Sequence, residues 1–555
     1  MVQRGSIQRV SQRLRRGLSR KDFLRLSGAG VAGAVFMGAA GCGSDSGSGD
    51  GSDEGDSVVI ALPEEPENLN PVFGDVYEGN WEVFNGLLRY ERDLSSVPDL
   101  AAAMPEVSED GRTITVGLRE GVQFHDGEPM TADDVVFTYE SILDPGVATG
   151  YRTLLGSLEE VRAVDERTVE FSLNRPDPAF MDKLQVGIIP EHILQDEDLN
   201  EAQFNREPVG TGPYRFEQWE AGERIVLSSN PDYYENRANI PRVVYTFIED
   251  ENARAAALEQ GSVDIAGLAP SVAPRFEDAE GLELYEVPSA DVRSVVLPTQ
   301  SGALADPRVR RALSLAVDRG AMVEGVLRGY GHAAYGPVFD EHWAYEPRIE
   351  VSHDPSEAES MLEEAGWTET NEEGIRQRDG EALSFTLMYP AGDSVRRDAA
   401  LAVSSQLEEI GVGVEVEGLG WEAIEPRIGE DAVVFGGGVP YDPDLELYNN
   451  YHSSLIDDGD PFSNPSELDD STIDAALEQG RSTRDRSERE EAYSRFQTEL
   501  AENGSWLSLV RLTHIVVASN EISGIEPQTQ GHAHGFSRGV KWNIERWTLQ
   551  GEGSA

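Results

Sequence analysis

Lysine is almost absent from this chain of 555 residues. Only Lys21, Lys183 and Lys541 are present, so arginine supplies nearly all of the 45 basic residues that stand against 102 acidic ones, for a formal net charge of −57 at pH 7. A surface of this sign repels nucleic acid and anionic lipid, which excludes a nucleic-acid partner. Molar salt shortens the screening length to about 3 Å and suppresses the self-repulsion of such a surface. The composition therefore indicates adaptation to high salt.

Cysteine is nearly absent too, because Cys42 is the single one. An intramolecular disulfide is therefore excluded. The sequence also lacks a Gly-x-Ser-x-Gly elbow, a phosphate-binding loop and a His-Glu-x-x-His motif, which argues against an enzyme. Beyond the first sixty residues no apolar run is long enough to cross a bilayer, so we expect a soluble body.

The first sixty residues have the pattern of an export signal. A basic stretch over residues 4–21 is followed by small and apolar residues over 26–40, which is too short for a comfortable membrane span. The run Ala39-Ala40-Gly41-Cys42 resembles a lipobox, which predicts that Cys42 becomes the lipid-bearing N-terminus of the mature chain. The alternative is that Cys42 is only a small residue in a discarded signal. Residues 1–42 are thus predicted as signal peptide and 43–57 as a flexible acidic Gly/Ser tether.

The export route is left open between two pathways. The run Ser19-Arg20-Lys21-Asp22-Phe23-Leu24 resembles the twin-arginine motif, with Lys21 in place of the second arginine. General secretion is the alternative.

The body alternates between the period of strands and that of helices. Ile114, Val116 and Leu118 alternate with polar residues and, with Val122 and Phe124, predict a hairpin. Thr131, with Asp134 three residues on, predicts a helix start. A strand over 385–389, a helix over 394–410 and a strand over 412–416 predict a βαβ unit, and hence an α/β sheet with parallel strands.

Several motifs in order resemble those of one family, the extracytoplasmic solute-binding proteins of dipeptide, oligopeptide and nickel ABC transporters (family 5), here of haloarchaeal type. The resemblance covers about residues 58–547. The matching runs are Leu69-Asn70-Pro71, Phe84-Asn85-Gly86-Leu87-Leu88, residues 118–127 (LREGVQFHDG), Thr131-Ala132-Asp133-Asp134-Val135, Gly210-Thr211-Gly212-Pro213-Tyr214, Asn230-Pro231-Asp232-Tyr233-Tyr234 and residues 306–312 (DPRVRRA).

The resemblance implies a two-lobed α/β periplasmic-binding-protein fold of class II, the large three-domain type, with a ligand cleft between the lobes. The first lobe would comprise residues 58–86, an inserted domain at 87–206, and 207–290. The second lobe would span 291–503. Residues 504–555 would return to the first lobe and form the C-terminal tail.

The resemblance also suggests ligand-binding residues. Trp421 falls where relatives place an aromatic wall, Arg427 near a basic pocket residue, and residues 435–444 where relatives cross the cleft floor. That floor holds Val439, Tyr441, Asp442 and Asp444. Val439 stands at the position where peptide-binding relatives place an aspartate, so Asp442 or Asp444 would have to substitute for that aspartate. Tyr77 would contact the ligand from the first lobe.

Each of these residues has a structural alternative. Trp421 would otherwise be core, Asp442 and Asp444 would be turn residues, and Arg427 would be locally paired. His532 and His534 form a His-x-His pair that leaves a metal-chelate ligand open, although no further ligands stand at metal-binding spacing.

The expected function is that of a substrate-binding lipoprotein of an ABC importer. It would capture an oligopeptide or dipeptide-like solute at the extracellular face of the membrane and deliver it to permease subunits as a monomer without a cofactor. A non-peptide solute such as a metal chelate or sugar, a sensory ligand-presenting module and, as the weakest option, a secreted hydrolase are the alternatives.

Overall fold

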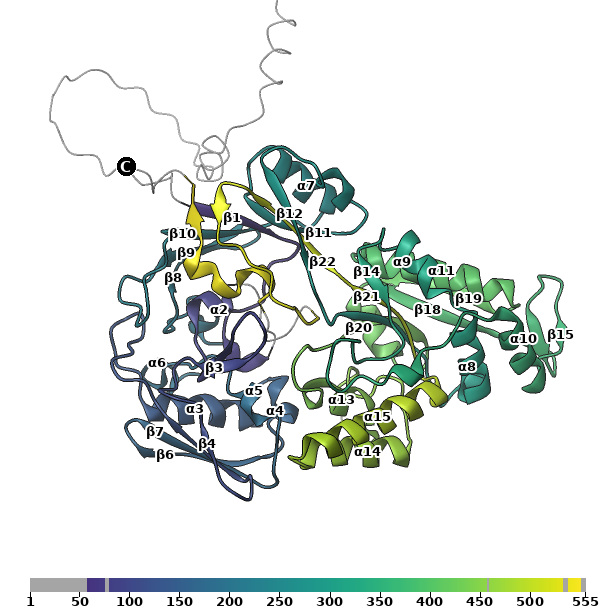
Figure 1. The fold of residues 1–555 in the computed structure, drawn as a ribbon, viewed down its shortest axis with the longest axis horizontal. Coiled ribbons are helices and arrows are strands. Elements are labelled where there is room, and N and C mark those ends of the chain that lie inside the picture. The colour runs from purple at the N-terminus through teal and green to yellow at the C-terminus, as the bar shows by residue number, and fades with distance from the viewer. Residues whose placement is uncertain (1–56, 75–78, 457–458, 533–537, 551–555) are drawn as a thin grey trace, which may run out of the picture.

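The computed structural model describes residues 57–74, 79–456, 459–532 and 538–550 and arranges them in two lobes (Figure 1). The first lobe carries a seven-stranded sheet and a smaller four-stranded one, and the second carries a six-stranded sheet. The seven-stranded sheet has the order β12-β22-β11-β1-β10-β9-β8. Its strands are β1 (Ser57–Leu62), β8 (Tyr214–Glu220), β9 (Arg224–Ser229), β10 (Arg242–Phe247), β11 (Ile265–Leu268), β12 (Leu282–Val287) and β22 (His514–Ser519).

The central strand of this sheet shows why the first lobe is α/β. All six residues of β1 are buried, and the strand runs parallel to both β10 and β11. A continuous apolar run of this kind suits a strand that is covered on both faces. Helix α7 (Glu251–Glu259) packs on β11 and β22 and provides part of this cover.

The inserted domain is built on a four-stranded sheet of order β4-β5-β7-β6. The strands are β4 (Glu106–Val107), β5 (Thr113–Gly117), β6 (Leu158–Asp165) and β7 (Thr168–Leu173). The capping-box prediction is confirmed, because Thr131 and Asp134 begin α3 (Ala132–Leu143). The hairpin prediction is wrong: β5 pairs with β4 and β7, and residues 122–124 form no strand beside it. Burial of Ile114 and Val116 against β7 outweighs the local turn signal.

The second lobe has helices on both faces of its sheet, of order β14-β21-β13-β20-β18-β19. Its strands are β13 (Val292–Val296), β14 (Gly331–Ala333), β18 (Ser384–Pro390), β19 (Gly413–Leu419), β20 (Ala432–Gly437) and β21 (Trp506–Leu512). One face is covered by α8 (Pro307–Ala316), α10 (Pro355–Glu364) and α11 (Ser394–Glu409), and the other by α13 (Asp444–Tyr451), α14 (Ser471–Ser482) and α15 (Arg486–Asn503). The βαβ prediction is confirmed, because α11 joins β18 to the parallel β19.

The boundary expected at residue 504 lies too early. Strand β21 is hydrogen-bonded between β13 and β14 of the second lobe, so the chain returns to the first lobe only at Thr513, between β21 and β22. Backbone pairing decides this, because an unpaired β21 would leave a row of buried amide groups unsatisfied.

Both lysines among the described residues are buried rather than exposed. Lys183 is 1% exposed and Lys541 9% exposed. The basic charge on the described surface is therefore carried by arginine, in keeping with the acidic, lysine-poor composition.

Candidate functional site

Two chain crossings lie side by side and connect the lobes. Residues 288–291 join β12 to β13, and Thr513 joins β21 to β22. Ser289 Oγ donates to the carbonyl of Leu512 at 2.6 Å, and the amide of Leu512 donates to the carbonyl of Asp291 at 2.8 Å. Gln530 from the C-terminal segment pairs with residues 288–290 as a third strand. A few element-terminal residues at such a crossing provide a hinge between lobes.

The interlobe edge of the second lobe lies at the carboxyl ends of its parallel strands. Strands β18, β19 and β20 all end there, and α11 begins there with Asp393 capping the amide of Arg396 at 2.9 Å. Trp421 begins α12 (Trp421–Ile424) directly after β19. In α/β sheets ligands bind outside the carboxyl ends of strands, so this edge is the candidate ligand-binding surface.

Two buried arginines meet at this edge. Arg293 comes from β13 and Arg396 from the first turn of α11, and each is 7% exposed. Arg293 pairs with Asp291, while Arg396 lies 3.4 Å from Asp393. The Nε atoms of both arginines have no hydrogen-bond partner within the described part of the chain. The Nε of Arg396 nevertheless lies 3.4 Å from Asp393 Oδ2 and is ion-paired, so among the described residues only the Nε of Arg293 lacks both an ion pair and a hydrogen bond.

His532 joins the arginines from the C-terminal segment. Its Nδ1 lies 2.9 Å from Asp291 Oδ1, and because a carboxylate only accepts, Nδ1 carries the proton. Its Nε2 is then an acceptor, 3.5 Å from Arg396 Nη2. Burial lowers the pKa of His532 to about 4, so the ring is neutral at pH 7. Burial opposes ionisation of Asp291, yet Arg293 and His532 hold the pKa of that carboxyl well below its usual range.

Gly436 in β20 provides the space in which these side chains meet. A Cβ atom at this position would lie 2.6 Å from Arg396 Nη2, 2.6 Å from His532 Cε1 and 2.7 Å from Arg293 Nη1. Any larger residue would displace the three groups, so the close approach requires glycine.

Trp421 is half-buried at the same edge. Its ring packs edge-on against Phe462 at 5.5 Å, and the guanidinium of Arg396 lies 5.5 Å from its centroid. Of the expected ligand-binding residues that the structure describes, Trp421 is the one in contact with the arginine cluster, and His532, expected only as a possible metal ligand, belongs to the cluster itself.

The segment after β20 is committed to protein contacts. Asp442 pairs with Arg489 at 2.6 Å, and Asp444 pairs with Arg481 at 3.1 Å. Val439 is half-buried against the core of the first lobe. The idea that Asp442 or Asp444 replaces the aspartate missing at Val439 is therefore not supported, because an arginine already neutralises each carboxylate.

This segment also touches the inserted domain. The ring of Tyr441 stacks on Tyr90 with centroids 5.0 Å apart and planes at 11°. The amide of Asp442 donates to Asp182 Oδ2 at 3.2 Å. Burial, together with the Asp442 carboxylate, raises the pKa of Asp182 to about 7. The lobes therefore meet away from the hinge through an aromatic stack and two facing carboxyl groups.

The remaining expected residues lie elsewhere. Arg427 pairs with Glu417 at 2.6 Å and Asp431 at 2.8 Å on the second lobe, as its structural alternative predicts. Tyr77, Cys42 and His534 lie outside the described residues.

Arg293, Arg396 and Glu446 were not expected from the sequence. The Glu446 carboxylate accepts the amide of Gly438 at 2.8 Å, and burial raises its pKa to about 7. Two signals were available: Arg293 is a charged residue in a strand whose five residues are all buried, and Arg396 is a cation in the first turn of a helix, where the helix dipole disfavours it.

None of the helices within the described ranges combines the length and apolarity that a membrane crossing needs. Across the same ranges, no three His, Cys, Asp or Glu side chains cluster so as to hold a metal ion.

Two α/β lobes, joined by crossing strands and facing each other across the ends of parallel strands, define the class of two-lobed solute-binding proteins. Solved structures of that class confirm the fold. NikZ from Campylobacter jejuni, in complex with Ni(L-His), is 31% identical with a TM-score of 0.83 over 89% of this chain and 99% of that one. The oligopeptide-binding protein AppA from Bacillus subtilis, in complex with a nonapeptide, is 28% identical with a TM-score of 0.78 over 89% of this chain and 98% of that one.

The chain belongs to the bacterial extracellular solute-binding proteins of family 5, whose family model (the family 5 Middle model) matches residues 95–464. Protein XP55 of Streptomyces lividans is 41% identical over 87% of this chain and 89% of its own length. The oligopeptide-binding protein AppA of Bacillus subtilis is 30% identical over 89% of this chain and 92% of its own length. Family 5 proteins are extracytoplasmic solute-binding components of ABC importers, and AppA is named as an oligopeptide-binding protein.

Proposed function

We propose that this protein captures an oligopeptide or dipeptide-like solute between its lobes and delivers it to an ABC permease, while a lipid on Cys42 holds it at the extracellular face of the membrane. The observation that carries the choice of solute is the pair of buried guanidiniums of Arg293 and Arg396. Their positive charge suits a carboxylate, which arginine binds with charge-assisted hydrogen bonds, and the Nε of Arg293 has no partner among the described residues.

The surroundings of the pair support a peptide rather than an inorganic anion. Trp421 and Phe435 are half-buried aromatic residues at the same edge, and aromatic walls with a few placed polar groups are typical of small-molecule sites. The relative AppA was solved with a nonapeptide. The solute's carboxyl group would face Arg396, and its chain would cross the ends of β20 and β13.

The first experiment is native mass spectrometry of the soluble body purified from its own host. A co-purifying ladder of peptides is expected, and a single non-peptide mass would contradict the proposal. Calorimetry with a tripeptide and its C-terminal amide then tests the carboxylate. We expect amidation to weaken binding about 10- to 100-fold, the value of one or two hydrogen bonds to a charged group. Equal affinities would rule out the arginine pair as the carboxylate site.

A matched pair of variants separates a local effect from a global one. Arg396→Gln should weaken tripeptide binding while binding of the amide changes little. Arg495→Ala removes an exposed arginine of the same lobe, on α15, and should change neither affinity. The thermal unfolding midpoint of both variants shows whether the lobe stays folded.

A metal–amino-acid chelate is the second candidate solute. Neutral His532 with Nε2 as its acceptor has the protonation state that a metal requires, and the relative NikZ was solved with Ni(L-His). Calorimetry with Ni²⁺ plus L-histidine, compared with L-histidine alone, tests it. Metal-dependent binding that His532→Ala abolishes would favour this solute over a peptide.

A further inference from the structure

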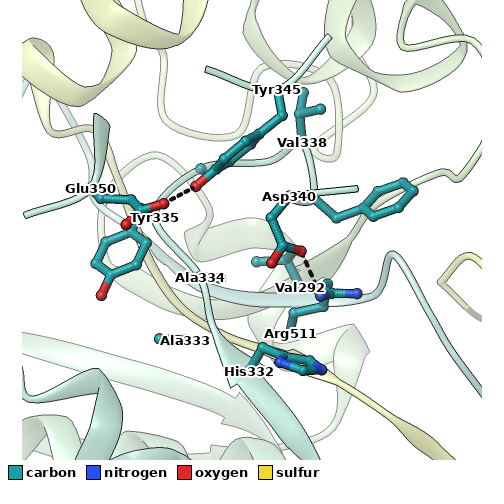
Figure 2. A pocket seen from close by; sticks show the side chains of 12 residues that line it. Val292, His332, Ala333, Ala334, Tyr335, Val338, Asp340, Tyr345, Glu350 and Arg511 are labelled. Carbon is teal, nitrogen blue, oxygen red and sulfur yellow. Dashed lines mark hydrogen bonds and ion pairs between the residues drawn. The ribbon is translucent and has the colours of Figure 1, made fainter. Parts of the chain in front are cut away.

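A hollow of about 250 Å³ opens on the second lobe beside the hinge (Figure 2). Val292 and Arg511 form part of its wall, from neighbouring strands of the sheet. The segment after β14 supplies Tyr335, Asp340 and Tyr345, followed by Glu350. None of these residues belongs to the arginine cluster around Arg293.

The hollow lies next to the interlobe edge. Val292 pairs with Gly437 of β20 on one side and with Arg511 of β21 on the other, and adjacent strands are about 4.8 Å apart. Directly paired residues of antiparallel strands share a face, so the hollow and Gly437 lie on one face of the sheet. His342 Nε2 lies 2.7 Å from the carbonyl of Tyr441, which ties the wall of the hollow to the segment after β20. Arg293 and Gly436 are the next residues along β13 and β20 and project from the opposite face, so a solute held by the arginine cluster would pass over the end of β20 to reach the hollow.

The charge around the hollow is negative. Arg511 is its one arginine, and its guanidinium is already bonded to Asp340 at 2.6 Å, Glu341 at 3.1 Å and the carbonyl of Ser289 at 3.0 Å. Two carboxylates thus outweigh the charge of one guanidinium, and the carboxylate of Glu350 adds a further negative charge.

The aromatic side chains reinforce this preference. The hydroxyl of Tyr345 donates to Glu350 Oε1 at 2.9 Å, and Figure 2 shows Tyr335 beside this pair. Carboxylates flanked by aromatic faces attract cations through charge and through the ring quadrupole. The guanidinium of Arg319 lies 5.1 Å from the Tyr335 ring centroid, so one face of that ring is already covered by a cation of the protein itself.

We propose that this hollow is a subsite of the solute site that binds a cationic group, either the terminal ammonium or a basic side chain of the solute. The hollow would supply the negative charge that a cationic group of the solute requires. Val439 has no charge, and Asp442 and Asp444 are already paired with arginines. This assignment rests on the proposed capture of peptide-like solutes between the lobes.

Calorimetry with matched peptides tests the subsite. The first pair, a tripeptide and its N-acetyl form, tests the terminal ammonium. The second pair, tripeptides with lysine or norleucine in the position farthest from the carboxyl end, tests a basic side chain. At least one of these cationic forms should bind about three- to tenfold more tightly than its neutral partner, and Glu350→Gln should remove that preference. Glu369→Gln, which neutralises an exposed carboxylate elsewhere in the lobe, should leave it intact. Equal binding within both pairs, or a preference that survives Glu350→Gln, would overturn the subsite.

A probe without a carboxylate shows whether the cationic subsite fails or whether only the assignment of a peptide as the solute fails. Agmatine carries a guanidinium and an amine, and saturation-transfer NMR detects weak binding to the intact soluble body. Agmatine signals that Glu350→Gln diminishes would support the subsite even if no peptide bound. Signals equal in wild type and variant, or none at millimolar agmatine, would reject it.

Discussion

The carboxyl group of Asp182 in the inserted domain faces Asp442 of the second lobe, and Asp182→Asn should favour closure of the lobes at neutral pH. The contact spans the lobes, because the amide of Asp442 donates to Asp182 Oδ2 at 3.2 Å. Tyr90 and Lys183 are the other titratable groups beside this carboxyl. Asparagine keeps the acceptor oxygen and removes the charge, as protonation would.

The magnitude follows from the pKa of Asp182, which burial and the Asp442 carboxylate raise from 3.8 to about 7. If opening returns this carboxyl to water, the difference between its pKa in the closed and open states corresponds to about 4 kcal/mol of closure free energy. We reduce this value to about 1–2 kcal/mol, because Asp182 is only half-buried and solvent screens its charge. A raised pKa means that the protonated form favours the closed state. The free energy that protonation of Asp182 contributes to closure is present in full below about pH 4 and decreases as the pH rises to about 7. Above that pH no further change is expected. About half of the loss falls between pH 5.5 and 8, so closure should weaken about two- to fivefold over this range.

The single cysteine makes the assay direct. A chain that begins after Cys42 contains no cysteine, so Glu197→Cys in the inserted domain and Ser487→Cys in the second lobe accept spin labels at two exposed positions. Electron–electron resonance distances at pH 5.5 and 8 report the closed fraction at constant salt. Asp182→Asn should remove the pH dependence, and Asp196→Asn, an exposed change in the same domain, should retain it. If Asp182→Asn and wild type have the same pH profile, the two facing carboxyl groups do not control closure.

Further changes test the arginine cluster and the inserted domain. Gly436→Ala places a Cβ 2.6 Å from Arg396 Nη2 and should weaken tripeptide binding about tenfold by calorimetry, with little change in unfolding; full affinity would show that the spacing is not required. Asp177→Ala leaves Lys183, 1% exposed and 2.7 Å from its partner, without a counter-charge, and should cost about 3–5 kcal/mol in urea unfolding at constant salt. Asp177→Leu combined with Lys183→Met should recover most of that loss, because two apolar side chains need no counter-charge; a double variant as unstable as Asp177→Ala would contradict this explanation.

Local patterns predicted much of the fold, because the relevant interactions lie within a few residues. The Thr131 capping box begins α3, and the alternation of strand and helix periods over residues 385–416 gives β18, α11 and parallel β19. The hairpin predicted around residue 120 failed, because β5 pairs with β7, which is remote in the chain. The crossing back to the first lobe was placed too early for the same reason: pairing of β21 with β13 joins the two ends of the second lobe.

The candidate site was less predictable than the fold. The resemblance to the family identified Trp421 and the segment after β20, yet the buried guanidiniums at the interlobe edge belong to Arg293 and Arg396. The local signals at these arginines do not indicate that they meet, because their side chains come together only through contacts with the remote His532.

The sequence by itself determined that this is an acidic, lysine-poor solute-binding protein of family 5, because composition and ordered motifs are properties of the chain alone. Only the tertiary structure decided which charged groups are available to a solute. Asp442 and Asp444 lie in the expected segment but pair with arginines of α15 and α14, whereas the Nε of Arg293 has neither an ion pair nor a hydrogen bond among the described residues. Whether a charge is free depends on which remote side chain folding brings within about 4 Å of it, and that distance is set by packing rather than by local sequence.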